Sequence, residues 1–169
     1  DTGYGWITCA EGSPLFDLGC MPISPLDDSL GGLEPALPVM SCRMERLIED
    51  LPPEEYLYNI GCMDNLYVRM ITWHDGEFDL IKGIPDLKRL FAPVESEAEA
   101  VSYAVAATGY RAEFGFEVVE GYRYLTNTIE ETHAVATEDG YVVNLFGYVI
   151  CGCGPHTNYR VDVTVSREG

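Results

Sequence analysis

Three possible metal ligands lie close together near the C-terminal end of the chain. They are Cys151, Cys153 and His156, which form the pattern C-x-C-x-x-H. Thiolate and imidazole groups bind zinc and copper, although this spacing differs from the usual zinc-finger patterns and a fourth ligand must come from elsewhere. In an oxidising compartment the thiols form disulfides instead. We therefore expect structural cysteines here, and Cys151, Cys153 and His156 remain candidates for a metal site.

A second candidate cation site consists of carboxylates in alternate positions beside a turn. Asp75, Glu77 and Asp79 supply oxygen ligands of the kind that calcium prefers. Their spacing lacks the internal glycine and the downstream glutamate of an EF-hand loop. The other interpretation is a hairpin whose acids face water. We predict no resident cofactor and keep calcium as the alternative.

The sequence offers little for acid–base or nucleophilic catalysis. Its three histidines are His74, His133 and His156, and the first and last of them adjoin predicted turns. The sequence has no G-x-S-x-G nucleophile motif and no glycine-rich phosphate loop. Because the chain has 28 acidic residues, a pair of carboxylates indicates nothing by itself. We predict no catalytic residue, and an enzyme is the less favoured interpretation.

Six cysteines in a chain of 169 residues predict disulfides and an oxidising location. The chain also starts at Asp1 without an initiator methionine, so we expect a secreted, extracellular or periplasmic protein. All the cysteines are disulfide candidates: Cys9, Cys20, Cys42, Cys62, Cys151 and Cys153. Short loops favour the pairs Cys9–Cys20 and Cys42–Cys62, which leaves the last two to pair with each other or with the earlier cysteines.

The clearest predicted element is a helix over residues 96–108. Ser96 and Glu99 form a capping box at its start, alanine fills much of its length, and Gly109 ends it. Before it, we predict a helix over 42–51 and a short helix or turn over 84–91. Strands are predicted over 66–73 and 78–82, joined by the turn His74-Asp75-Gly76. The strands predicted after it cover 114–118, 122–137, 141–153 and 159–166, with a turn at 138–140.

This order of elements predicts an α+β fold, in which an antiparallel β-sheet meander packs on the 96–108 helix. In outline it resembles the curled sheets of cystatin-like and NTF2-like folds, a likeness of topology that implies no function. Residues 1–42 hold five of the ten prolines and no Lys or Arg. We therefore predict an irregular, Pro-rich apolar arm over 1–42 and a single globular domain over 43–169. The arm packs either on its own domain or on a neighbouring subunit.

Charge and composition exclude several classes of protein. The chain has 28 acidic residues against 10 Lys and Arg, for a net charge of −18. Nucleic acids and anionic membranes require a basic surface, so we expect neither as a partner. The sequence has no apolar run long enough to span a membrane. With 47% hydrophobic residues the chain is expected to fold, with its acids spread over the surface.

These observations favour a secreted, non-catalytic structural or interaction protein. We expect it to form a homo-oligomer or polymer, such as an extracellular filament or surface assembly, in which the arm of one copy docks on its neighbour. The alternative is a secreted small-ligand-binding or inhibitor module, or a hydrolase with an unrecognised site. That alternative places a pocket in the curled sheet beside the 96–108 helix.

Overall fold

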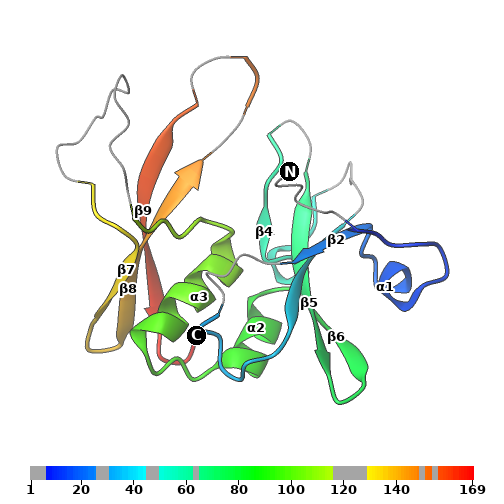
Figure 1. Ribbon diagram of the computed structural model, residues 1–169, viewed down its shortest axis with the longest axis horizontal. Helices are drawn as coiled ribbons and strands as arrows, with labels where there is room; N and C mark the ends of the chain where they lie inside the picture. The colour runs from blue at the N-terminus through cyan, green and yellow to red at the C-terminus, as the bar shows by residue number, and fades with distance from the viewer. Residues whose placement is uncertain are drawn as a thin grey trace.

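The computed structural model describes residues 7–25, 31–44, 50–62, 65–115, 129–148, 151–153 and 156–169. They form an α+β fold, as the sequence predicts, with helices packed between two antiparallel sheets (Figure 1). The predicted single meander corresponds to the second sheet, and the strands before the main helix form a sheet of their own. None of the described helices is both long enough and apolar enough to cross a membrane.

Within the described residues, the first sheet has six strands arranged around β5 (Tyr67–His74). β3 pairs along one edge of β5, while β4 and β6 pair with the start and the end of its other edge. The outer strands β2 and β1 extend the sheet beyond β3. The bounds of these strands are β1 Ile7–Thr8, β2 Pro22–Pro25, β3 Val39–Arg43, β4 Tyr58–Asn59 and β6 Glu77–Ile81.

The turn between β5 and β6 confirms the predicted hairpin. Asp75 and Gly76 both have positive φ, 51° and 87°, as a type I′ turn requires. Asp and Gly tolerate this conformation better than other residues, which is why their adjacency predicts a hairpin. The hairpin extends outward from the body of the molecule (Figure 1).

In the described part of the chain, the second sheet is a three-stranded meander of β7 (His133–Ala136), β8 (Gly140–Tyr148) and β9 (Asn158–Ser166). Its register places His133 opposite Asn144, and Asn144 opposite Asp162. Residues opposite each other point to the same face of a sheet. Val143, next to Asn144, is buried in the core, so the row of three polar residues lies on the outer face.

The main helices are α2 (Ile84–Phe91) and α3 (Glu97–Thr108). α3 was predicted as a helix, and the short helix or turn expected over 84–91 is the helix α2. Ser96 caps α3 by accepting a hydrogen bond from the backbone N–H of Glu99 at 3.2 Å, and Gly109 ends the helix with φ 69°. α3 packs on all three strands of the second sheet, and α2 joins it to β6. Two shorter elements are α1 (Pro14–Asp17) and the 3-10 helix η2 (Pro53–Glu55).

The two faces of β5 contribute to two separate hydrophobic clusters. Met70 belongs to the main core, which joins the helices to both sheets. Ile71, the next residue, points to the opposite face and packs with Cys9, Cys20 and Cys42. Side chains of α1 and its neighbours cover this second cluster. The first sheet is therefore covered on both faces near the middle of β5.

The described part of the predicted arm contains short regular elements between irregular stretches. It supplies α1 and the strands β1, β2 and β3, and Leu33 is 4% exposed within the main core. β3 also crosses the predicted boundary between residues 42 and 43. Proline ends and short lengths hide the alternation of these strands in the sequence. The arm packs on its own sheet, the first of the two predicted alternatives.

The helix predicted over 42–51 does not begin at Cys42, because Cys42 and Arg43 belong to β3. Residues 45–49 of that prediction lie outside the described residues. So do residues 116–118 of the predicted strand 114–118 and residues 122–128 of the predicted strand 122–137. The remainder of the latter contains β7 and is followed by the predicted turn at 138–140.

The structure has two disulfides, and neither pair favoured by loop length is formed. Cys20 pairs with Cys42, and Cys62 pairs with Cys151, with Cα–Cα distances of 5.0 and 5.5 Å. Cys9 and Cys153 are free thiols. The first disulfide ties α1 and β2 to β3, because its cysteines precede β2 and lie in β3. The second connects residues that follow strands of different sheets.

Candidate functional site

The candidate metal ligands near the C-terminus are not brought together. Cys151 is bonded to Cys62 and has no thiolate to offer, while Cys153 is free and exposed. The ring of His156 lies edge-on to Tyr148, with 6.1 Å between their centroids. Within the described ranges, no group of three or more His, Cys, Asp or Glu side chains is placed to hold a metal ion.

The carboxylates proposed for calcium lie along the β5–β6 hairpin, but two of them already face cationic or ionisable partners. Asp79 Oδ1 lies 3.2 Å from Arg89 Nη2, and Asp75 Oδ2 lies 3.4 Å from His74 Nδ1. An arginine next to a carboxylate opposes the binding of a cation there. Glu77, the third member, lies beside the hollow described below.

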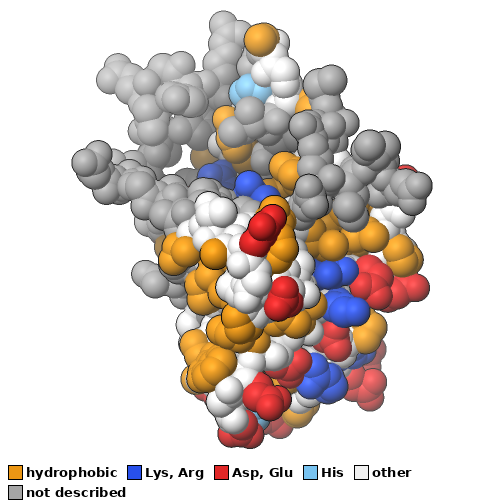
Figure 2. Space-filling model, turned by 90° about the vertical axis from the view of Figure 1, so that its right-hand side faces the viewer, with side chains coloured by type: hydrophobic (Ala, Val, Ile, Leu, Met, Phe, Trp, Pro, Cys, Tyr) orange, Lys and Arg blue, Asp and Glu red, His pale blue; other side chains and the backbone are white. Residues whose placement is uncertain are grey.

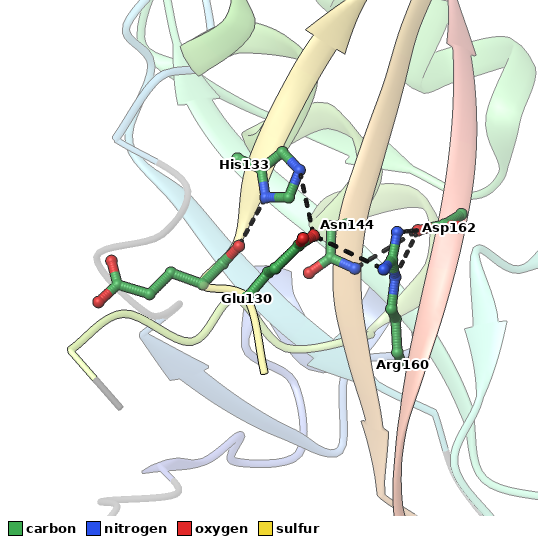
Figure 3. Close-up of polar contacts among 6 residues, drawn as sticks. Glu130, His133, Asn144, Arg160 and Asp162 are labelled. Atoms are coloured by element: carbon green, nitrogen blue, oxygen red, sulfur yellow. Dashed lines mark hydrogen bonds and ion pairs between the residues drawn. The ribbon is translucent and has the colours of Figure 1, made fainter. Parts of the chain in front are cut away.

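His133 belongs to a polar network on the outer face of the second sheet (Figure 3). Its Nδ1 lies 2.7 Å from the carbonyl oxygen of Glu131, and its Nε2 lies 4.0 Å from Glu130 Oε2. Glu130 Oε2 also lies 3.6 Å from Arg160 Nη1. Arg160 in turn pairs with Asp162 at 3.0 Å, and Asn144 Nδ2 donates to Asp162 Oδ1 at 3.4 Å.

This network connects polar and charged side chains of all three strands of the second sheet. Hydrogen bonds from Arg160 and then from Asn144 lower the pKa of Asp162, because they stabilise its carboxylate. The side chains of His133 and Arg160 are 43% and 54% exposed, so water screens these ion pairs. The arrangement links β7, β8 and β9, and its carboxylates are paired with other members of the network. We assign it a structural role in the sheet.

A hollow between α1 and the β5–β6 hairpin has a different character. It is open to solvent, has a volume of about 500 Å³ and is lined by Pro14, Asp17, Leu18, Trp73, Gly76, Glu77 and Phe78. We call it the Trp73 hollow. Trp73 and Phe78 meet edge to face, with 4.6 Å between ring centroids and 68° between planes. On this side of the molecule, hydrophobic side chains lie next to acidic ones (Figure 2).

The hollow forms because α1 is shorter than the hairpin that it covers. Ile71 and Leu80 are opposite each other on the hairpin and pack beneath α1 with Phe16. The next pair on the same face is Trp73 and Phe78. α1 has only four residues, so this second pair remains 47% and 37% exposed.

Comparison with known protein families, with curated proteins and with solved structures finds no match to this chain. The arrangement of its own residues is therefore the basis for any proposal about its function.

The Trp73 hollow was missed in the sequence, although a signal for part of it exists. Aromatic residues on both sides of an Asp-Gly turn predict a cross-strand aromatic pair. Their exposure depends on where α1 ends, and α1 falls in the segment predicted to be irregular. The hollow also differs from the pocket of the alternative function, because it lies on the first sheet and α3 packs on the second.

Proposed function

We propose that the protein is a secreted, non-catalytic interaction protein that contacts a macromolecular partner through the Trp73 hollow. The observation that carries this proposal is the exposed pair Trp73–Phe78. Large exposed aromatic groups cost free energy in water, and contiguous ones mark interaction sites. Tryptophan is also among the residues that contribute most to binding when a partner buries them.

The cysteines support a location outside the reducing cytosol. Four of the six form disulfides within the chain, and one of these joins residues 89 positions apart. Such bonds persist in secreted, extracellular or periplasmic proteins. An acidic surface suits this setting, because like charges keep separate molecules from aggregating.

A photo-cross-linker in the hollow tests this function. We expect Phe78→p-benzoylphenylalanine to form covalent adducts with one distinct macromolecule in the extracellular material of the producing organism. The matched control is Phe114→p-benzoylphenylalanine, because Phe114 is 62% exposed but does not line the hollow. Absence of adducts at position 78, or the same adducts at both positions, would overturn the proposal.

Self-association is a second candidate function, and strand β9 favours it. This nine-residue strand pairs with β8 and with no other strand of the described ranges. An open strand edge can pair with another chain, and a head-to-tail contact of this kind produces filaments. The arm-docking form expected from the sequence requires the arm to leave a sheet in which it already supplies three strands.

Light scattering over a range of concentrations tests self-association. If a second copy pairs at β9, the measured mass should rise above the monomer's 18.7 kDa as the concentration increases. Thr164→Lys should lower that mass, because an added charge on an exposed edge strand opposes pairing. A constant monomer mass for the unmodified protein contradicts this second function. Deleting residues 1–40 would not be a clean test of arm docking, because the deletion also removes β1, β2 and the start of β3 from the first sheet.

A further inference from the structure

We infer that the Trp73 hollow receives an arginine side chain presented by a basic segment of a protein partner. This inference rests on the proposed interaction function and adds the chemistry of the partner. It follows from three properties of the hollow: the charge of its lining, the aromatic pair within it, and its openness to solvent.

The lining is apolar and acidic. Asp17 comes from α1 and Glu77 from β6, and the described lining residues include no Lys, Arg or His. A neutral partner would remove water from these carboxylates without replacing its hydrogen bonds, which costs free energy. A cationic partner replaces those bonds and is attracted by the net charge of −18.

Two bases beside the hairpin, Arg89 and Lys82, are already engaged by other carboxylates. Arg89 lies 3.2 Å from Asp79 and 3.7 Å from Asp86, and Lys82 lies 3.5 Å from Glu55. These pairs reduce the repulsion that a free Lys or Arg would exert on an incoming cation. The hollow therefore keeps its acidic character, although basic residues lie on the same face of the molecule (Figure 2).

The aromatic pair favours arginine over other cations. Tryptophan is the strongest aromatic partner for a cation. A guanidinium group is planar, so it can stack on an aromatic ring and direct N–H groups to carboxylates at the same time. The edge-to-face contact of Trp73 with Phe78 restrains both rings in advance. Asp17 and Glu77 lie on the same hollow to accept the hydrogen bonds.

The openness of the hollow favours a side chain carried by a protein over a free small molecule. Trp73 remains 47% exposed and Phe78 37% exposed, so the hollow encloses its contents on one side only. Small ligands need pockets that bury most of their surface. A protein partner brings additional surface around the anchoring residue, of the order of 800 Å² on each side in a stable complex.

Fluorescence anisotropy with the full chain tests this inference. The probe is a dye-labelled nine-residue peptide with three arginines separated by glycines, and peptides with lysine or glutamate in place of arginine are compared with it. We expect the arginine peptide to bind best and the glutamate peptide not to bind. Trp73→Leu keeps an apolar side chain but removes the ring, and should weaken binding about 3- to 30-fold, the range of a partly buried cation–π contact.

A matched pair of charge variants separates the hollow from general attraction to an acidic protein. Asp17→Asn with Glu77→Gln removes two charges from the hollow, and Glu138→Gln with Glu168→Gln removes two exposed charges that do not line it. The first pair should weaken binding at least about 5-fold more than the second, because hydrogen bonds between charged groups exceed distant attraction. Circular dichroism and thermal unfolding confirm that each variant is folded.

Three results would overturn the inference: equal weakening by the two charge pairs, no effect of Trp73→Leu, or equal binding of the lysine and arginine peptides. Failure here is distinguishable from failure of the proposed function. Adducts at position 78 without binding of the arginine peptide leave the interaction function in place and reject arginine as the ligand. Absence of both rejects the hollow as a contact surface.

Discussion

Gly109 lies directly against the ring of Tyr58. A Cβ atom at position 109 would be 2.5 Å from two carbons of that ring. Gly109 ends α3, which packs on the second sheet, whereas Tyr58 belongs to β4 of the first sheet. The contact therefore joins the end of the main helix to an outer strand of the first sheet. Burial in this position raises the pKa of Tyr58 to about 12.

Replacing Gly109 should destabilise the protein more than its backbone conformation alone explains. Gly109 and Gly115 share a φ of 69°, but a Cβ at Gly115 meets nothing within 4 Å. We expect Gly115→Ala to cost about 1–2 kcal/mol in free energy of unfolding through left-handed strain. Gly109→Ala should cost about 2–4 kcal/mol, because overpacking adds to the strain. Urea denaturation measures both, and equal losses would contradict the packing explanation.

The two free thiols should react at very different rates. Cys9 is 7% exposed and Cys153 is exposed. Burial raises the pKa of the Cys9 thiol, so less of the reactive thiolate is present at pH 8. We expect Ellman's reagent to detect one fast thiol in the folded protein and two after denaturation. Cys153→Ser should remove the fast phase, and a fast phase that survives it would contradict the assignment.

Removing Glu55 should leave Arg69 without its main charged partner. Arg69 is 8% exposed, and its Nη2 lies 2.9 Å from Glu55 Oε2. Its Nε also donates to the backbone carbonyl of Glu55 at 2.7 Å, and this bond survives a side-chain change. Glu55→Gln should therefore lower the free energy of unfolding by about 1–2 kcal/mol, less than for a fully buried pair. The control is Glu54→Gln, an exposed neighbour, which should change it by less than about 0.5 kcal/mol.

Tyr103→Phe should preserve or increase stability. The hydroxyl of Tyr103 is buried and has no hydrogen-bond partner among the described residues, so its removal relieves an unsatisfied polar group and gains up to about 1 kcal/mol. Burial also raises the pKa of Tyr103 to about 12. Between pH 10 and 12 the unfolded chain loses this proton while the folded chain keeps it, so stability falls as the pH rises through that window. The variant should show a smaller alkaline loss than the unmodified protein in urea denaturation, and an equal loss in both would contradict this explanation.

Features set by neighbouring residues could be predicted from the sequence. Ser96, Glu99 and Gly109 define α3 because helix caps depend on local hydrogen bonds and backbone angles. Asp75 and Gly76 define the hairpin for the same reason. The alternation of apolar and polar residues in 159–166 similarly identifies β9.

Features that depend on distant residues could not be predicted. Cys20 pairs with Cys42 because the first sheet aligns β2 with β3, and short loops gave no indication of that register. The Trp73 hollow depends on the four-residue length of α1, whose position on the hairpin follows from the packing around Ile71. The network around His133 joins residues from 130 to 162, and only the strand register places them in one row.

The two disulfides determine how the molecule responds to tension. Their sequence separations are 22 and 89 in a chain of 169 residues, and the loops do not overlap, so about two-thirds of the chain lies inside closed loops. A force applied at the two ends passes through the disulfides and can straighten only the remaining third, roughly 200 Å at the length of an extended residue. Both α2 and α3 lie within the larger loop and are shielded from direct pulling. Under load the protein should therefore extend over a short distance, while the segments inside the two closed loops stay folded.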